Sequence, residues 1–264
     1  MEHNMDVSAN IKMALLLTTI AGSATLIGAA IAYFIKEPRL SYLTFSLGFS
    51  AGVMLYVSFM ELLTGAIKTL GQLKAVIAFF IGMFFIGIID FFIPESENPD
   101  HFNNLQGPHQ ETMLDSKLLR ASMMTALAIG IHNFPEGLAT FGAAMTNIKL
   151  GVFITIAIAI HNVPEGISVS LPIFYATGNK NKAFLFSAIS GMSEPLGALV
   201  GYVILRPFLS PGLLAALLAF VAGIMVYISV DELLPMAHRY GHGHTVIKGI
   251  ISGMIIMAAS LIIL

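Results

Sequence analysis

Cysteine is absent from the 264-residue sequence, and charged side chains make up only 11% of it. Without cysteine the chain has neither a disulfide nor a thiolate ligand for a metal. Soluble domains carry about 25% charged residues. A chain with so few charges could not cover the surface of a soluble globule of this size. The net charge of −2 gives the chain no positive excess with which to attract the phosphates of a nucleic acid. We therefore expect a membrane protein with no nucleic-acid partner.

The residues that are present are mostly apolar: 56% are hydrophobic, and the mean hydropathy is +0.85. A helix needs about 20 apolar residues to cross a bilayer, and eight segments meet that requirement. They cover residues 13–35, 41–65, 74–94, 118–144, 149–174, 183–205, 212–236 and 246–264. The sequence predicts an all-α polytopic membrane protein with residues 1–264 in one transmembrane domain. Residues 1–10 lack the basic region of a signal peptide, so we expect the first span to be retained.

The connections between the spans predict how the chain is oriented. Residues 95–117 form the single long connection, which is polar, contains Pro99 and Pro108, and is expected to be flexible. Eight spans place both termini on one side. If that side is outside, the inner loops hold Lys36, Arg39, Lys117, Arg120, Lys180, Lys182, Arg239 and Lys248, and the outer segments hold Lys12, Lys68, Lys74, Lys149 and Arg206. The inner excess predicts termini outside and a cytoplasmic 95–117 loop.

Two pairs of segments resemble each other within the chain. Residues 49–63 (FSAGVMLYVSFMELL) align with 220–234 (FVAGIMVYISVDELL), and residues 28–38 align more weakly with 197–207. Polar positions shared by the first pair make a chance match of apolar helices a poor explanation. Each pair lies five spans apart, so its members run in opposite directions. Such an inverted repeat is typical of secondary transporters.

The most polar intramembrane feature is HNFPEG at residues 132–137, which returns as HNVPEG at 161–166. On a helix the His and Glu of each copy share a face, with the Asn about 100° away. The prolines free a backbone carbonyl, and the glycines let a neighbour approach. These groups would each cost several kcal/mol if they faced lipid. One copy alone would indicate a buried hydrogen-bonded pair, whereas two copies on antiparallel helices favour a cage of N and O ligands for a divalent transition metal.

Three more residues are candidates for the same chemistry. Glu194, in GMSEPLGAL, lies inside the sixth span at a depth suited to completing the cage. Glu61 lies toward one end of the second span and is equally consistent with an auxiliary metal site or an acid at the membrane surface. His238 begins HRYGHGH, which either collects and releases metal at one mouth or is simply a polar turn.

The two HNxPEG motifs and GMSEPLGALVGY resemble the ZIP (Zrt/Irt-like) family of divalent-metal transporters, especially its bacterial zinc-uptake branch. The resemblance extends over all eight spans. It implies eight helices in a 3+2+3 arrangement, a bacterial cytoplasmic membrane location with both termini outside, and a two-metal site on spans 4, 5 and 6. Zinc would be the transported substrate, and no catalytic cofactor or enzymatic activity is expected.

The resemblance also implies a role for each site residue. His132, His161 and Glu165 would form one metal position. Asn133, Glu136 and Asn162 would form the other, and Glu194 would bridge the two. Some members of the family have Gln and Asp where this chain has His161 and Asn162, which leaves the second position here one negative charge poorer.

Other functions fit the sequence less well. An intramembrane metalloprotease usually carries H-E-x-x-H on one helix, whereas each histidine here is followed by asparagine. A Na⁺ site would use oxygen ligands rather than two imidazoles. Channel-like permeation stays open as a mechanism, as do Fe²⁺, Co²⁺, Mn²⁺ and Cd²⁺ as cargo. The oligomeric state is also open, a homodimer included.

The inverted repeat predicts movement. Spans 1, 4, 5 and 6 should move as a group against a frame of spans 2, 3, 7 and 8. We expect the boundaries between these groups to pair span 4 with span 2 and span 5 with span 7.

Overall fold

A computed structural model describes residues 2–35, 39–92, 110–205, 210–241 and 243–263, and the elements in these ranges are helices. They form eight rods, three of which contain π-helical turns labelled η. The rods are α1 (Glu2–Phe34); α2 (Leu40–Val57), η1 (Ser58–Leu63) and α3 (Thr64–Leu70); α4 (Gln72–Phe91); α5 (Gln110–Thr146); α6 (Ile148–Thr177); α7 (Lys180–Gly191), α8 (Ser193–Val200) and η4 (Gly201–Leu205); α9 (Pro211–Ile228), η6 (Ser229–Leu233) and α10 (Leu234–Tyr240); and α11 (Gly243–Ile263).

Seven of the described rods contain a stretch that is long and apolar enough to cross a membrane. These stretches are Asn10–Phe34, Leu40–Leu70, Gln72–Phe91, Ile148–Thr177, Lys180–Ile204, Pro211–Tyr240 and Gly243–Ile263. The prediction of an all-helical polytopic membrane protein is therefore confirmed.

The remaining predicted span, 118–144, is the fourth along the chain and lies on α5, which is helical throughout but is not among those seven. α5 begins at Gln110, so the last eight residues of the segment expected to be a loop are helical. Residues 110–117 (QETMLDSK) include good helix formers, which can extend a helix beyond its apolar part. The remainder of the expected loop, up to residue 109, lies outside the described residues.

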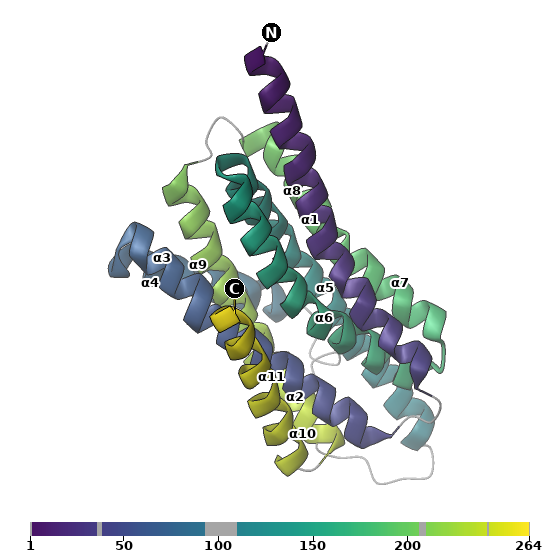
Figure 1. The fold of residues 1–264 in the computed structure, drawn as a ribbon. Helices are drawn as coiled ribbons and strands as arrows, with labels where there is room; N and C mark the ends of the chain where they lie inside the picture. The colour runs from purple at the N-terminus through teal and green to yellow at the C-terminus, as the bar shows by residue number, and fades with distance from the viewer. Residues whose placement is uncertain (1, 36–38, 93–109, 206–209, 242, 264) are drawn as a thin grey trace.

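The rods pack in two groups (Figure 1). One group contains α1, α5, α6, α7 and α8, which pack closely on one another; the other contains α2, α3, α4, α9, α10 and α11. We call them the motif group, because α5 and α6 carry the two hexapeptides, and the frame group. Contacts between the groups run mainly from α2 to α6 and from α9 to α5. The expected boundary pairs are therefore wrong: span 2 packs on span 5, and span 7 packs on span 4.

Glycines bring the helices of the motif group into backbone contact. A Cβ at Gly28 of α1 would overlap the carbonyl oxygen of Val163 on α6, and a Cβ at Gly197 of α8 would overlap that of Phe134 on α5. The aligned segments 28–38 and 197–207 pair Gly28 with Gly197, and the two motifs pair Val163 with Phe134. The contact between α1 and α6 is therefore repeated between α8 and α5.

A second set of glycine contacts follows the same correspondence. Gly166 approaches the carbonyl of Thr25, and Gly137 approaches the carbonyl of Glu194. In the register of the repeat, Thr25 occupies the position of Glu194. Gly22 and Gly191, which also correspond, each approach the other's carbonyl oxygen. Where a residue contacts its own counterpart, the two must lie at the axis that relates the two copies of the repeat. That axis therefore passes between α1 and α7.

The frame group repeats a local feature as well. Ser58 begins η1 and donates a 2.7 Å hydrogen bond to the carbonyl of Met54, while Ser229 begins η6 and donates a 2.7 Å bond to the carbonyl of Met225. A π-helical turn interrupts the regular helical ladder and often marks a functional region. Both turns lie where the sequence alignment matches 49–63 with 220–234.

The contact between α1 and α6 generates a test of helix packing. Gly28→Ala should destabilise the protein by about 1–3 kcal/mol, because the added methyl group must push two backbones apart. Gly65→Ala is the matched control: Gly65 lies inside α3 with nothing within 4 Å of an added Cβ, so better helix propensity should make it neutral or stabilising. Thermal unfolding of the purified variants would measure both. Equal melting temperatures for the two variants would contradict the close contact.

Candidate metal centre

The two hexapeptides lie side by side inside the motif group. α5 and α6 are joined by a single residue, Asn147, whose side chain accepts hydrogen bonds from the backbone N–H groups of Lys149 and Leu150 and caps α6. This short connection makes the two helices antiparallel neighbours. Pro135 and Pro164 lie inside unbroken helices. The His, Asn and Glu side chains of both copies are at most 1% exposed, and Glu194 is fully buried.

The histidines and glutamates pair crosswise between the two copies. His132 Nε2 on α5 lies 3.0 Å from Glu165 Oε1 on α6, and His161 Nε2 on α6 lies 2.8 Å from Glu136 Oε1 on α5. Each imidazole thus meets the carboxylate of the other motif, although the sequence places a glutamate four residues after each histidine on its own helix. The two pairs are equivalent: matching each residue of one motif with its counterpart in the other converts one pair into the other. Four ligating groups therefore gather between α5 and α6.

The two asparagines tie this cluster to the rest of the motif group. Asn162 Nδ2 donates to Glu194 Oε1 of α8 and, over 2.8 Å, to the carbonyl of Ala21 on α1. Asn133 Nδ2 lies 3.4 Å from the carbonyl of Ser190 on α7. Ala21 and Ser190 occupy corresponding positions in the repeat. The asparagines therefore link both motif helices to the helices that flank them.

The oxygen end of the Asn133 amide faces Glu165 Oε2, which is an acceptor, and His132 Nε2, which is an acceptor when it carries no proton. It lies 2.9 Å from His132 Nε2 and 3.3 Å from Glu165 Oε2. Acceptor atoms at such distances repel one another unless a donor or a cation lies between them. Reversing the amide would turn its N–H groups toward them, and a metal ion bound by all three would have the same effect.

Three ligands lie close enough together to share one ion. One ligand atom each from His132, Glu136 and Glu165 lies within 4.8 Å of the others. Two ligands at about 2.0–2.2 Å from a zinc ion are at most about 4.4 Å apart, so a small contraction would complete the coordination. This group combines residues that the family resemblance divides between two positions: His132 and Glu165 in one, and Glu136 in the other. His161 contacts Glu136, and Glu194 accepts a hydrogen bond from Asn162, the sequence neighbour of His161.

Several ligating atoms in this cluster are buried without a hydrogen-bond partner among the described residues. They are His132 Nδ1, Glu136 Oε2, His161 Nδ1, Asn162 Oδ1 and Glu194 Oε2. Burying a polar atom without a partner destabilises a protein by roughly 1–3 kcal/mol per group. Imidazole nitrogen, carboxylate oxygen and amide oxygen are all ligand types of divalent transition metals. The donor set therefore fits such an ion.

The two auxiliary candidates are not among the three converging ligands. Glu61 is partly buried in η1, within electrostatic reach of His161 and Glu136, and its Oε2 atom is buried without a hydrogen-bond partner. His238 is exposed near the end of α10 and its Nδ1 lies 2.9 Å from the carbonyl of Leu234 on the same helix. His244 is exposed at the start of α11, whereas His242 lies outside the described residues.

A second group of acids was not singled out by the sequence analysis as a site. Asp90 of α4 and Asp231 and Glu232 of η6 offer carboxylate oxygens within 4.8 Å of one another. Tyr227 donates a 3.1 Å hydrogen bond to Asp90 Oδ2. The signal in the sequence was three acids inside apolar spans 3 and 7, where charged residues are rare.

The cluster should bind metal in a pH-dependent way. An imidazole must be deprotonated to bind a metal, and free imidazole titrates near pH 6.5. Lowering the pH from 7.5 to 5.5 should therefore weaken zinc binding, because protons compete for His132 and His161. Calorimetric titration of the purified protein would measure this, and His132→Gln should show weaker binding with a shallower pH dependence. Affinity that stays constant from pH 5 to 7.5 would exclude histidine ligation.

Comparison with known proteins agrees with this chemistry. The family described as ZIP Zinc transporter matches residues 92–261. The chain is 51% identical to the zinc transporter ZupT of Clostridium perfringens over 96% of both chains, and 49% identical to that of Streptococcus mutans over 97% of this chain and 99% of the relative. The zinc transporter ZupT of Chlorobium chlorochromatii is 50% identical over 96% of this chain and 98% of the relative. These are transporters rather than enzymes, and the predicted resemblance is confirmed. The chain belongs to the ZIP family of zinc transporters.

Proposed function

We propose that this protein takes up Zn²⁺ across the cytoplasmic membrane of a bacterium through a metal site inside the membrane. The observation that carries the proposal is the crossed pairing of His132 with Glu165 and of His161 with Glu136. Zinc transporters with about half of their residues identical to this chain support the choice of ion. The protein's contribution is to replace the ion's hydration shell with fixed ligands in an apolar surrounding.

Each ligand has a role in this proposal. His132, Glu136 and Glu165 hold one ion, because their ligand atoms already converge. Asn133 lies beside His132 and Glu165 and can join the same ion. His161 and Asn162 complete a second, weaker position, with Glu194 bridging the two. Glu61 and His238 guide ions toward or away from the site. An N/O cage without thiolate also accepts Fe²⁺, Co²⁺, Mn²⁺ and Cd²⁺, with affinities that broadly follow the Irving–Williams order.

The proposed topology has eight membrane spans, α5 included, in a 3+2+3 inverted repeat with both termini outside. The repeated glycine contacts and π-helical turns support the repeat. The excess of Lys and Arg in the inner loops supports the orientation. In this arrangement α5 and α6 form the central pair, which is where a secondary transporter places its substrate site.

Transport proceeds by alternating access in this proposal, with the motif group moving against the frame group. The division of the helices into two packed groups supports this mechanism (Figure 1). The glycine contacts bind α5 and α6 to α8 and α1, so the ligands would move together. A channel would instead leave the two groups fixed.

Zinc uptake into proteoliposomes tests the function. Glu165→Ala should lower uptake by more than about tenfold, since even residues behind the ligands of a metal site typically contribute 10–100-fold to its affinity. Leu196→Ala, on the exposed face of α8, is the control for reconstitution and should retain uptake. Uptake by Glu165→Ala at the rate of the control would refute the proposed site.

The movement generates a second test at the boundary between the groups. Ser50 of α2 donates a 2.6 Å hydrogen bond to the carbonyl of Pro164 on α6, next to Glu165. This bond must break if α6 moves past α2. A hydrogen bond contributes about 0.5–1.5 kcal/mol net, so Ser50→Ala should speed departure from this conformation by roughly two- to tenfold.

Ser46→Ala is the matched control, because Ser46 is a buried serine of the same helix that donates to its own helix at Leu43. Stopped-flow measurement of zinc release would give the rate, and calorimetry would show whether zinc affinity is unchanged. Identical release rates in the two variants would count against movement at this boundary.

A further inference from the structure

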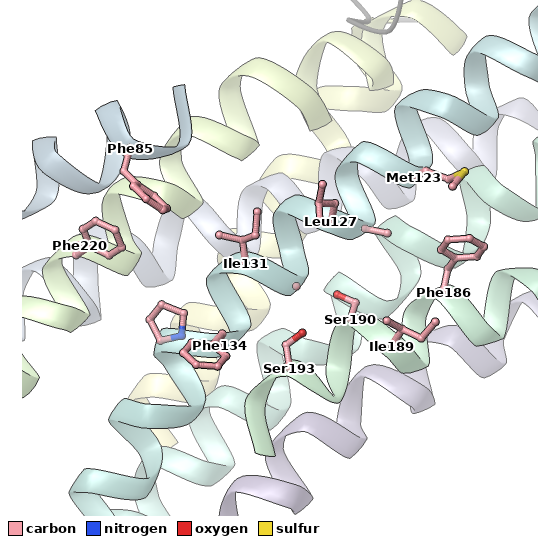
Figure 2. Close-up of a pocket in the computed structure, with 13 residues that line it drawn as sticks. Phe85, Met123, Leu127, Ile131, Phe134, Phe186, Ile189, Ser190, Ser193 and Phe220 are labelled. Atoms are coloured by element: carbon pink, nitrogen blue, oxygen red, sulfur yellow. The ribbon is translucent and has the colours of Figure 1, made fainter. Parts of the chain in front are cut away.

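An apolar groove of about 770 Å³ lies between the two groups of helices. Figure 2 shows its lining: Phe85 and Phe220 come from the frame group, and the opposite wall comes from α5, α7 and α8. The rings of Phe85 and Phe220 stand 5.4 Å apart at one end. Met123 and Phe186 line the other end (Figure 2). The groove therefore runs along α5, behind the face that carries the metal ligands.

The groove opens onto the surface that faces lipid. Leu127, Ile189 and Phe85 in its walls are 50%, 59% and 43% exposed, respectively. Its wall is apolar apart from the hydroxyls of Ser190 and Ser193 among the described residues, so ordered water would find few partners. An empty groove would forfeit dispersion contacts along its whole lining. Because the groove is continuous with the bilayer interface, an acyl chain is the occupant that suits it.

A cation lies on the same helix face as the groove. Lys182 is in the first turn of α7, four residues before Phe186 and eight before Ser190, and these spacings place it on the groove side. Lysine side chains in helices extend toward the helix N-terminus, which here leads away from the membrane interior. The α7 N-terminus, capped by Asn179, adds the positive end of the helix dipole. The neighbouring Lys180 is already engaged with the carbonyls of Tyr33 and Ile35.

We propose that this groove and Lys182 form a binding site for an anionic phospholipid. One acyl chain lies in the groove between Phe186 and Phe134, and the phosphate of the headgroup pairs with the Lys182 ammonium. The occupant comes from the leaflet in which α5 and α7 begin. This site is separate from the proposed zinc site, and lipid binding to it does not depend on zinc transport.

The location of the groove gives the lipid a consequence for the protein. An acyl chain there separates Phe85 and Phe220 of the frame group from Leu127 and Ile189 of the motif group. Any displacement of one group against the other would reshape the groove and change its affinity for the chain. By reciprocity, lipid binding would then shift the balance between conformations.

Native mass spectrometry of the full chain in detergent tests the proposal, with dioleoyl phosphatidylglycerol and dioleoyl phosphatidylcholine as probes. One favourable lysine–headgroup interaction should make the anionic lipid bind about fivefold more tightly than the zwitterionic one. Lys182→Gln should remove that preference. Lys149→Gln is the matched control: Lys149 also lies in the first turn of a helix capped by asparagine, but α6 does not line the groove. Equal binding of the two lipids to the unmodified chain, or equal effects of the two lysine variants, would overturn the headgroup assignment.

A second pair of variants tests the acyl chain. Leu127→Trp adds bulk within the groove and should weaken binding of both lipids. Leu196→Trp makes the same change at an exposed position of α8 outside the lining and should leave binding unchanged. If Leu127→Trp retains both lipids as well as Leu196→Trp does, the chain does not lie in the groove. Melting temperatures of the lipid-free variants distinguish a lost site from a damaged fold.

Discussion

The crossed histidine–glutamate pairs between α5 and α6 are the interaction on which the rest of the structure depends. They place ionisable groups in an apolar bundle, where a polar atom without a partner is strongly unfavourable. Each carboxylate is therefore held against an imidazole of the other helix. Two helices that exchange such pairs must keep a fixed distance and register. The remainder of the motif group supplies that constraint.

Close backbone packing supplies the constraint. In a membrane, van der Waals contact and hydrogen bonds hold helices together, because lipid provides no hydrophobic driving force between them. Gly137 and Gly197 bring α5 and α8 together, and Gly166 and Gly28 bring α6 and α1 together. The asparagines add hydrogen bonds in the same directions. Each motif helix is thus fastened to a different flanking helix, and the four form one unit around the ligands.

Much of this could be predicted from the sequence, for identifiable reasons. The apolar runs predicted the spans, since a bilayer imposes a minimum length on a helix that crosses it. The repeated HNxPEG motif predicted the candidate ligands. The partner of each ligand could not be predicted. Helical spacing puts Glu136 on the face of His132, but the relative rotation of α5 and α6 decides that Glu136 Oε1 meets His161. Likewise, the packing of α2 on α6 rather than on α5 depends on how whole helices fit. The start of α5 at Gln110 reflects helix propensity beyond the apolar span, which hydropathy does not detect.

Thr25 and Glu194 occupy corresponding positions but differ in chemistry, which makes the two halves of the protein unequal although their backbones match. Two matching halves of a scaffold would make the conformations open to either side equal in energy. Here one half carries a carboxylate and the other a hydroxyl at the matching position, and both side chains are fully buried. A cation held as proposed would be drawn toward Glu194 on α8, away from the axis between Gly22 and Gly191. In the proposed transport cycle, Glu194 would therefore help the chain to distinguish the two sides of the membrane, although the backbone contacts of the two halves match.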